Sequence, residues 1–304
     1  MNHLLLKENY DLKNHTTFKI GGEAQKVYFP DTQETLIDLL NSNENAIVLG
    51  NASNVLISSY GIDNSIIFTS NLKKVNIDNT EMQAECGVLG ISLAKMALKN
   101  SLSGFEFLIG FPSTVGGAVF MNASCHNQFI SDTFIEGKFF KKDSKEIINL
   151  KKDQMKFAYR TSLLMDKEDL ICLEAKFRLQ KGNKIDIENL MNRNLDFRKQ
   201  YQPSLKTPNI GSIFKNPEND SAGRLLDIAG CKKFVENDAK VWEKHANFIV
   251  NNGNSDSLDV LKLMKRMKDE VYNRYAINLI PEIRFIGGKN KEENEIWKNL
   301  IEIM

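Results

Sequence analysis

A segment rich in small residues, GFPSTVGGA at positions 110–118, restricts the folds open to this chain more than any other feature. A proline fixes one turn, a serine and a threonine add hydroxyl groups, and the pair Gly116-Gly117 lets the backbone approach a ligand closely. This combination resembles a pyrophosphate cradle built without a Rossmann fold. The structural alternative is a glycine-rich loop that closes against a neighbouring helix.

A second segment of the same kind, GNASNVL at 50–56, directly follows the apolar strand pattern AIVLG at 46–50. Small residues after a strand allow close approach, and their N–H groups can form a nest for a phosphate. The segment does not match G-x-G-x-x-G, so a Rossmann dinucleotide loop is not predicted. Taken alone, it is most often an ordinary turn; the two segments together favour a dinucleotide ligand.

Length and charge narrow the class of protein. The 304 residues suit two or three domains, and 42% hydrophobic with 26% charged residues predicts a globular chain with a substantial core. Lys+Arg number 40 and Asp+Glu 39, a formal net charge of +1. Without a broad basic surface, nucleic acid is not an expected partner.

The cysteines and the apolar stretches indicate a cytoplasmic location. Cys86, Cys125, Cys172 and Cys231 form no C-x-x-C pair, so we expect no metal site, and scattered cysteines are typical of buried thiols in a reducing compartment. The N-terminus lacks a signal-peptide core, and the apolar stretch 102–123 contains a glutamate, a proline and several glycines. No membrane span is therefore expected.

Hydrophobic periodicity predicts strands and helices in mixed order, which is an α+β fold. Asp31 with Glu34 resembles a capping box at the start of one helix, and Ser255 or Asp256 is the expected N-cap of another. That second helix places Leu261, Met264, Met267, Val271 and Tyr275 on one face, as a core stripe. We expect strands at 26–30, 46–50, 66–70, 75–77, 82–86, 134–140, 171–179, 247–251 and 281–287, and further helices at 91–99, 187–195 and 222–229.

Three polar residues stand in short distinctive contexts: Arg160 in FAYRTS, Ser212 in GSIFKNP and Glu282 in PEIRFIG. By itself Arg160 is most often a structural arginine, Ser212 a turn serine and Glu282 a solvated strand residue. No G-x-S-x-G elbow surrounds the serine, which argues against a serine hydrolase. Spacing alone does not join these residues into a site.

These contexts together resemble the UDP-N-acetylenolpyruvoylglucosamine reductase (MurB) family, in its shorter type II branch. The matching segments occur in the family's order and cover nearly the whole chain. They are NHTTFKIGG (14–22), VLGNASNVLI (48–57), LSGFEFLIGFPSTVGGAVFMNAS (102–124), YRTS (159–162), GSIFKNP (211–217), AGRLLDIAG (222–230), EKHANFIVN (243–251) and PEIRFIG (281–287).

The resemblance implies an FAD-binding domain of the vanillyl-alcohol-oxidase (PCMH) type in two subdomains, followed by an α+β substrate-binding domain. We expect the first subdomain at 1–70, with 279–304 returning to it. The second would cover 71–182, and the substrate-binding domain 183–278. FAD would be bound non-covalently, and no obligate protein partner is expected.

The implied reaction is NADPH-dependent reduction of UDP-N-acetylglucosamine enolpyruvate, an enolpyruvyl ether of a UDP-sugar, in peptidoglycan precursor synthesis. NADPH acts as co-substrate, hydride passes through FAD, and a serine supplies a proton. By resemblance the catalytic residues are Arg160 for the substrate carboxylate, Ser212 as proton donor, and Glu282, which would hold and polarise the enol-like intermediate.

The resemblance also assigns contacts. The substrate contacts are Tyr159, Lys215, Asn216 and Arg224. The cofactor contacts are Gly50, Asn51, Ala52, Ser53, Asn54, Val55, Leu56, Pro112, Ser113, Thr114, Val115, Gly116, Gly117, Ala118, Asn122, Ala123 and Ile171.

The chain departs from the family's common pattern in places. Asn51-Ala52 stand in a position where a glycine run is usual, and Ser113 replaces a common glycine. After Asn122, the residues ASCHN (123–127) replace the commoner Ala-Gly-Ala-Tyr-Gly. Cys125 could be a redox residue or a flavin tether, but a plain buried thiol is the simpler interpretation.

Two other functions share the flavin fold. One is a different oxidoreductase, such as a 2-hydroxy-acid dehydrogenase; the segments GSIFKNP and HANFIVN argue against it. The other is a non-catalytic flavin-binding protein, against which the joint presence of Arg160, Ser212 and Glu282 argues.

Overall fold

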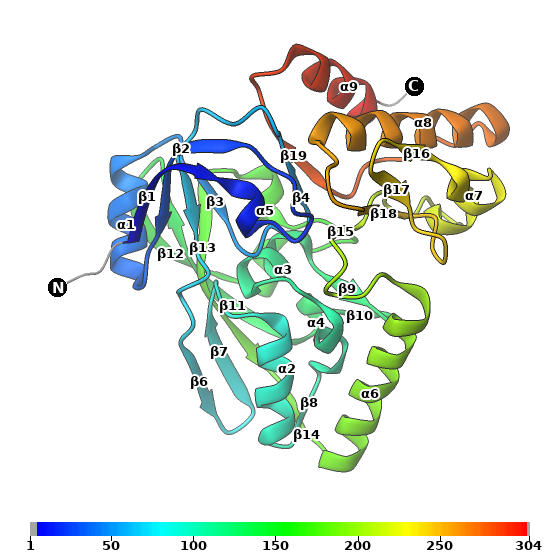
Figure 1. Ribbon diagram of the computed structural model, residues 1–304. Coiled ribbons are helices and arrows are strands. Elements are labelled where there is room, and N and C mark those ends of the chain that lie inside the picture. The colour runs from blue at the N-terminus through cyan, green and yellow to red at the C-terminus, as the bar shows by residue number, and fades with distance from the viewer. Residues whose placement is uncertain (1–4, 303–304) are drawn as a thin grey trace. The chain divides into compact units, whose positions relative to one another are not determined.

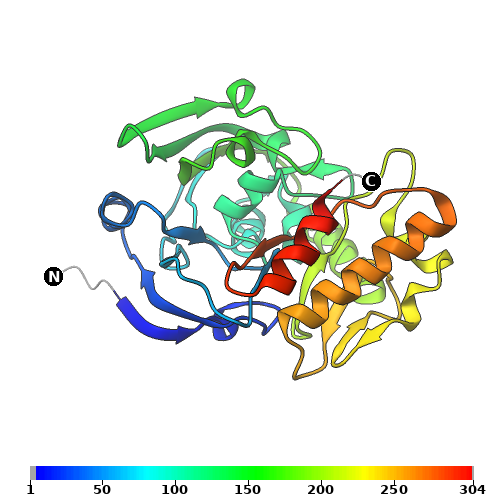
Figure 2. The same ribbon diagram turned by 90° about the horizontal axis from the view of Figure 1, so that it is seen from above.

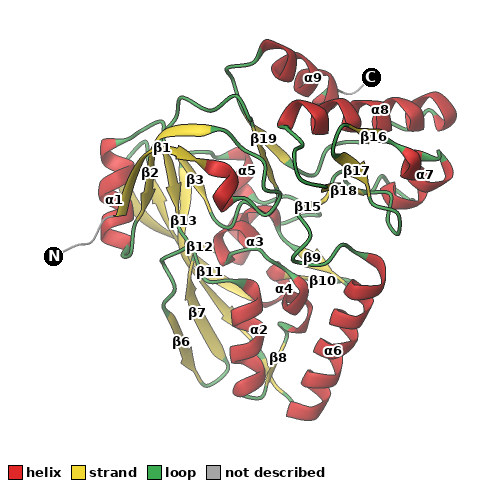
Figure 3. Cartoon of the chain, in the orientation of Figure 1, coloured by secondary structure: helices red, strands yellow, loops and turns green. Residues whose placement is uncertain are grey.

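The computed structural model describes residues 5–302, which contain helices and strands in mixed order (Figures 1 and 3). The chain divides into two units, each built from separate segments. Unit 1 comprises the residues up to Lys7 together with Val27–Asn51 and Ser65–Phe197. Unit 2 comprises Glu8–Lys26, Ala52–Asn64 and the residues from Arg198 onward. The α+β class is confirmed, and the domain boundaries expected at 70, 182 and 278 stay predictions.

A five-stranded antiparallel sheet, in the order β12-β11-β13-β7-β6, is the largest element of unit 1. On its strand β13 (Leu170–Arg178), Leu173, Ala175 and Phe177 are buried, as the period-2 pattern predicts. The other strands of this sheet are β6 (Val75–Asp78), β7 (Glu81–Glu85), β11 (Phe134–Lys141) and β12 (Glu146–Lys151).

A second sheet has the order β1-β2-β5-β3, in which β5 runs parallel to both β2 and β3. Its strands are β1 (Leu5–Asp11), β2 (Glu23–Phe29), β3 (Ile47–Leu49) and β5 (Ile66–Phe68). Two-stranded ribbons are formed by β8 (Leu102–Ser103) with β14 (Gln180–Lys181), and by β9 (Ser124–Cys125) with β10 (Gln128–Phe129).

The helices of unit 1 bury apolar faces in one core, which extends from Tyr28 to Met191 along the chain. Thr32 is the N-cap of α1, because its hydroxyl accepts the Thr35 N–H. The expected cap Asp31 is therefore wrong by one residue. The helices are α1 (Gln33–Ser42), α2 (Gly90–Lys99), α3 (Val115–Met121), α4 (Ile130–Thr133), α5 (Leu163–Asp166) and α6 (Lys184–Tyr201), with 3₁₀ turns at Glu106–Gly110 and Lys152–Met155.

Unit 2 has its own core and a four-stranded antiparallel sheet in the order β15-β18-β17-β16. Its strands are β15 (Asn209–Ser212), β16 (Val235–Glu236), β17 (Ala239–Val241) and β18 (Phe248–Asn251). A parallel pair is made by β4 (Val55–Ile57) and β19 (Arg284–Ile286). Helices α7 (Ala222–Ile228), α8 (Ser257–Tyr275) and α9 (Lys291–Ile301) and 3₁₀ turns at Leu12–His15 and Cys231–Lys233 complete this unit.

Helix α8 tests the predicted methionine stripe. Asp256 caps it, and Leu261, Met264, Met267 and Val271 are fully buried, so these methionines are core residues. Tyr275, expected on the same face, is 37% exposed because it lies in the last turn of the helix. Helix α9 packs alongside α8 (Figure 2). None of the described helices is long and apolar enough to cross a membrane.

Candidate functional site

The two small-residue segments meet in unit 1. Asn51 Nδ2 donates a hydrogen bond to the carbonyl of Pro112 over 2.7 Å. A Cβ placed on Gly50 would lie 2.1 Å from the Thr114 hydroxyl oxygen. Gly50 thus lets the end of β3 come into contact with the segment at 110–118, which a side chain at position 50 would not permit.

The segment at 110–118 contains the start of a helix, which was not predicted from the sequence. Val115–Met121 form α3, capped by Thr114, whose hydroxyl accepts the Gly117 N–H over 3.3 Å. The Val115 and Gly116 N–H groups donate to the carbonyls of Val88 and Cys86, each over 2.8 Å. These two N–H groups already have protein acceptors, so they are not free to bind a phosphate.

The two glycines of α3 have different surroundings. A Cβ on Gly116 would lie 3.1 Å from Cys86 Cβ and 3.3 Å from its carbonyl oxygen. The nearest atom to a Cβ on Gly117 would be the Thr114 hydroxyl oxygen, at 3.5 Å. Gly116 therefore serves close packing against the residue that follows β7, whereas Gly117 borders open space.

This neighbourhood fits a ligand with hydrogen-bonding groups such as FAD. The Ser113 hydroxyl oxygen is buried and has no hydrogen-bond partner among residues 5–302. A buried hydroxyl of this kind is costly unless another group bonds it. Ser113 and the open side of Gly117 would thus hold part of the cofactor.

Asn122 and Ala123 end α3. Asn122 is in the left-handed region (φ 44°) and only 2% exposed. Its Nδ2 donates to the Ala158 carbonyl over 2.9 Å, and its Oδ1 accepts the Ser131 N–H over 3.3 Å. The Asn122 side chain therefore ties α3 to the segment that carries Arg160, and its cofactor contact stays a prediction.

Arg160 occupies a tight turn with a strained backbone. Ala158 and Thr161 exchange backbone hydrogen bonds of 3.2 Å around Tyr159-Arg160, and Arg160 has φ 53°. Non-glycine residues in this region cluster at functional sites. The guanidinium donates from Nη1 to the Ser124 hydroxyl over 2.6 Å and from Nη2 to the Ser124 carbonyl over 3.3 Å. Its carbon lies 5.3 Å from the centre of the exposed Tyr159 ring.

The remaining unit 1 candidates differ in burial. Val115, Ala118 and Ala123 are buried, whereas Ile171 is half-buried on β13 opposite Phe140.

Burial raises the pKa of the Cys86 thiol to about 12, and Cys172 is buried likewise. Cys125 is half-buried in β9, so the expectation that all four thiols are buried is wrong there.

In unit 2, the segment after β15 runs beside the segment that carries Glu282. The Glu282 N–H donates to the Ile213 carbonyl over 2.8 Å, and the Lys215 N–H donates to the Ile280 carbonyl over 2.9 Å. Gly211 (φ 79°) lies at an irregularity in the pairing of β15, directly before Ser212, so the expected turn serine is a strand residue. Ser212 and Glu282, which are distant in sequence, therefore lie on adjacent backbone segments, and both are half-buried.

The rest of the segment at 50–56 belongs to this part of unit 2. The Asn54 side chain donates to the Glu282 carbonyl over 3.1 Å, and the Arg284 N–H donates to the Asn54 carbonyl over 3.0 Å. Ala52 is buried with φ 45°, a conformation that suits the glycine more usual in this position. Ser53 faces Gly211, with its carbonyl oxygen 3.9 Å from where a Gly211 Cβ would be.

Asn247, which the sequence did not single out, holds the Ser212 segment. Its carbonyl accepts the Ile213 N–H over 2.9 Å, and its side chain bonds the N–H and carbonyl of Phe214 over 2.9 and 2.8 Å. Its own N–H donates to His245 Nδ1 over 3.3 Å. The sequence signal for its role was an asparagine in the apolar run NFIVN, because a buried side-chain amide must be hydrogen-bonded to a neighbouring segment.

The other substrate candidates lie on the same part of the chain. Asn216 accepts the Ala222 N–H over 3.1 Å with its side-chain oxygen. Arg224 on α7 is exposed and pairs with Asp220 through two hydrogen bonds, which lower the pKa of Asp220 to about 2. A phosphate that binds Arg224 must compete with this carboxylate.

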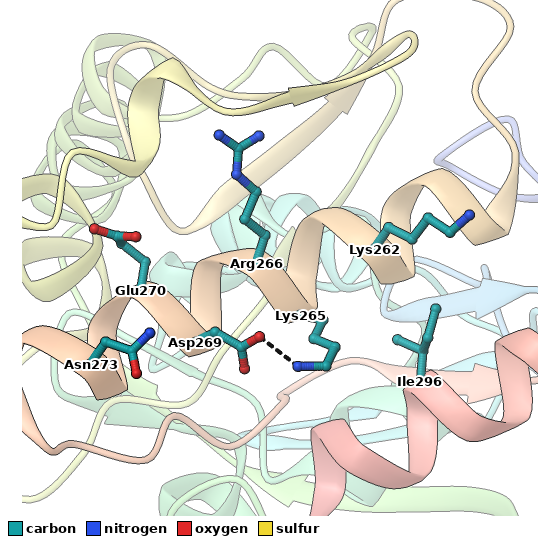
Figure 4. A pocket seen from close by; sticks show the side chains of 7 residues that line it. All are labelled: Lys262, Lys265, Arg266, Asp269, Glu270, Asn273 and Ile296. Atoms are coloured by element: carbon teal, nitrogen blue, oxygen red, sulfur yellow. Dashed lines mark hydrogen bonds and ion pairs between the residues drawn. The ribbon is translucent and has the colours of Figure 1, made fainter.

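A shallow hollow of about 340 Å³ lies on α8 and contains none of the predicted site residues (Figure 4). Two lysines that line the hollow form ion pairs. Lys265 pairs with Asp269, which also lines it, and Lys262 pairs with Glu292, which does not. The Arg266 guanidinium lies 3.9 Å from the Phe234 ring centre. Among the described residues, no cluster of His, Cys, Asp and Glu could hold a metal ion.

Comparison with known proteins identifies the family. Residues 24–147 match the family model described as an FAD binding domain. Residues 202–286 match the C-terminal domain of UDP-N-acetylenolpyruvoylglucosamine reductase. The fold class expected from the sequence, a flavin-binding domain of this type followed by a second α+β domain, is confirmed.

Similar proteins cover nearly the whole chain. UDP-N-acetylenolpyruvoylglucosamine reductase from Clostridium botulinum is 39% identical over 93% of this chain and 93% of its own length. The Bacillus subtilis protein of that name is 36% identical over 92% and 93%. The crystal structure of the Thermus caldophilus reductase (MurB) superposes with a TM-score of 0.81 at 30% identity, over 94% of this chain and 100% of that one. The chain therefore belongs to the UDP-N-acetylenolpyruvoylglucosamine reductase family, and it is an oxidoreductase with an FAD-binding domain.

Proposed function

We propose that this chain reduces UDP-N-acetylglucosamine enolpyruvate to UDP-N-acetylmuramate, with NADPH as hydride donor, in peptidoglycan precursor synthesis. The names of the similar proteins supply the reaction. The observation that supports it most is the bond from the Glu282 N–H to the Ile213 carbonyl, which puts the two candidate acid groups of unit 2 on adjacent segments. We also propose that the protein is cytoplasmic.

FAD, when bound, supplies hydride transfer, and the protein must then orient the substrate, stabilise negative charge and deliver a proton. Gly50, Asn51 and Thr114 bring the two small-residue segments into contact, and Ser113 has the unsatisfied hydroxyl that a cofactor would bond. These residues are the proposed cofactor contacts that the geometry supports best.

Arg160 is the proposed partner of the substrate carboxylate. A guanidinium binds a carboxylate through two parallel hydrogen bonds and stays charged. Its strained turn and its bonds to Ser124 hold the group in one orientation. Preorganised donors of this kind are typically worth about 3–4 kcal/mol in a reaction that develops negative charge.

Ser212 is the proposed proton donor, and Glu282 polarises the enol-like form of the substrate. Among the described residues, the Ser212 hydroxyl has no hydrogen-bond partner, so its proton is available. The pairing of β15 with β18 and the hydrogen bonds of Asn247 to Ile213 and Phe214 fix the backbone around it. Lys215, Asn216, Tyr159 and Arg224 are proposed substrate contacts.

The family match also bears on the two alternative functions. A 2-hydroxy-acid dehydrogenase on the same flavin fold would not need the C-terminal reductase domain that matches residues 202–286. A non-catalytic flavin protein would not need Ser212 and Glu282 on adjacent segments.

Ser212→Ala tests the proposal. NADPH should reduce the bound flavin at nearly the parent rate, because no serine proton is needed for that step. Transfer to the enolpyruvyl substrate should slow by about 10²–10⁴-fold, the usual contribution of general acid catalysis. Stopped-flow measurement of the two half-reactions separates them.

Two further variants serve as controls. Ser212→Cys should retain part of the activity because a thiol also donates, and Ser204→Ala, which alters an exposed turn serine, should match the parent. If Ser212→Ala reduces the substrate at the parent rate, Ser212 is only a turn residue. The proton donor must then be sought at Glu282 or an ordered water.

A further inference from the structure

Ser124 opens a small hairpin that follows α3. Its strands β9 and β10 pair Ser124 with Phe129 and Cys125 with Gln128. The two residues of the turn, His126 (φ 52°) and Asn127 (φ 60°), both have left-handed backbones, as a tight type I′ hairpin requires. The hairpin therefore holds the Ser124 backbone in a defined position.

The Arg160 guanidinium binds two oxygens of this one residue. Nη1 donates to the Ser124 hydroxyl over 2.6 Å, and Nη2 donates to the Ser124 carbonyl over 3.3 Å. Two bonds from one planar guanidinium fix its rotation as well as its direction. The shorter bond goes to the hydroxyl, so the side chain of Ser124 is the stronger of the two restraints.

Both segments rest on the C-terminal end of α3. The buried Asn122 side chain bonds the Ala158 carbonyl, just before Arg160, and the Ser131 N–H, just after β10. The Ser162 hydroxyl donates to the Phe120 carbonyl over 2.8 Å. Ser124 and Arg160 are thus held by the same short stretch of backbone, which keeps their contact in register.

We propose that Ser124 is a positioning residue, whose hydroxyl and carbonyl orient the Arg160 guanidinium to receive the substrate carboxylate. The proposal rests on the function proposed above for Arg160. A hydroxyl oxygen that accepts from arginine keeps its own hydrogen and adds no competing negative charge. An acidic residue in the same place would instead neutralise the guanidinium that the carboxylate needs.

The chain's departure from the common family pattern makes this a property of this protein. A glycine is more usual at this position, and it would remove the 2.6 Å bond to the hydroxyl while keeping the 3.3 Å bond to the carbonyl. Nothing in the backbone of β9 requires a serine, since Cys125 continues the same strand with a different side chain.

The first test uses the FAD-loaded full chain with Ser124→Ala, Ser124→Gly and Ser124→Thr. Loss of a hydrogen bond to a charged group should slow substrate reduction by about 10-fold or more in the Ala and Gly variants. Flavin reduction by NADPH should be unchanged, and Thr, which keeps the hydroxyl, should restore the rate. The matched control is Ser144→Ala, which removes an exposed hydroxyl bonded to Glu146 in the same unit. Equal slowing of both half-reactions, or no slowing in Ser124→Ala, overturns the proposal.

A double-mutant cycle with Arg160→Lys asks whether Ser124 acts through Arg160. If it does, Ser124→Ala has little further effect once Arg160 is lysine. If the rate loss of the double variant equals the product of the losses in the two single variants, the proposal is contradicted.

A readout without substrate separates this proposal from the proposed function. In ¹⁵N-arginine NMR spectra, the Arg160 guanidinium should rotate faster about its Nε–Cζ bond in Ser124→Ala than in the parent. If the rotation is unchanged and Arg160→Lys still reduces the substrate slowly, the role of Ser124 is overturned and that of Arg160 stands. An Arg160→Lys variant that reduces substrate normally overturns the role of Arg160, and that of Ser124 with it.

Discussion

At the scale of single residues, the adjacent glycines Gly116 and Gly117 have different surroundings. A Cβ placed on Gly116 would lie 3.1 Å from Cys86 Cβ, whereas one on Gly117 would meet only the Thr114 hydroxyl oxygen, at 3.5 Å. A side chain on Gly116 therefore crowds Cys86, and a side chain on Gly117 enters open space beside Thr114. The two positions can be used to separate folding from cofactor binding.

We expect Gly116→Val to lower the free energy of unfolding by about 1–3 kcal/mol, the usual cost of overpacking. Gly117→Val should unfold close to the parent when both proteins are stripped of FAD, but it should purify with little flavin. Denaturant unfolding and the absorbance ratio of flavin to protein measure the two effects. A fully yellow Gly117→Val variant would show that the cofactor does not approach this residue.

At the scale of elements, helix α9 is held at its C-terminal end by a buried lysine of α8. Lys268 is 2% exposed, and its ammonium donates to the carbonyls of Leu300, Glu302 and Asn299 over 2.7, 2.9 and 3.3 Å. These carbonyls belong to the last turn of the helix or follow it, where acceptors lack partners and a cation is favourable. Burial lowers the pKa of Lys268, and the nearby carboxylates of Asp269 and Glu302 oppose this shift.

Lys268→Met should therefore leave several carbonyls without their donor and cost about 2–3 kcal/mol of stability. Lys265→Met on the same helix is the matched control, because Lys265 is half-buried at the surface and pairs with Asp269 one turn away (Figure 4). A surface pair of this kind contributes little, and the control should change stability by under about 0.5 kcal/mol. Equal effects of the two changes in denaturant unfolding would refute the role given to Lys268.

The segment from His245 to Asn247 makes unit 2 sensitive to pH. Burial lowers the pKa of His245, and its Nδ1 accepts the Asn247 N–H. Below the ordinary histidine pKa of about 6.5 the unfolded chain takes up a proton that the folded chain still excludes. The stability contributed by neutral His245 is thus complete above that pH and is lost as the pH falls towards the lowered pKa.

We expect the melting temperature to fall less between pH 7.5 and pH 5.5 in His245→Gln than in the parent. His126→Asn, which changes an exposed histidine, should keep the parent's pH dependence. Differential scanning calorimetry at the two pH values makes the comparison. If His245→Gln keeps the parent's pH dependence, groups other than His245 cause the loss of stability at low pH.

At the scale of the whole molecule, each unit has its own apolar core, although neither is a continuous stretch of chain. The cofactor contacts proposed in unit 1 are turns, a helix start and a buried hydroxyl, and none is a residue with an established role as a flavin tether. We therefore expect the FAD to be held by non-covalent contacts alone.

Acid denaturation followed by ultrafiltration should leave all flavin in the filtrate. Flavin that stays with the polypeptide would contradict this expectation. The half-buried Cys125 would then be the first thiol to examine, because Cys86, Cys172 and Cys231 are buried.

The sequence by itself determined the elements whose pattern is local, and the family through its motifs. The period-2 run of β13 and the methionine stripe of α8 appear where they were expected, because alternation and helical spacing depend only on neighbours along the chain. The motif segments, read in order, were sufficient to identify the family, which the comparisons confirm.

Only the tertiary structure decided which partners the polar side chains have. That Asn122 bonds Ala158, that Ser124 holds Arg160, and that Glu282 lies beside the segment of Ser212 all depend on contacts between residues far apart in sequence. The start of α3 within the glycine-rich segment was missed for the same reason, since the acceptors of its first N–H groups lie on Cys86 and Val88. Local pattern carries no information about such partners, because hydrogen bonding between distant segments is settled when the chain packs.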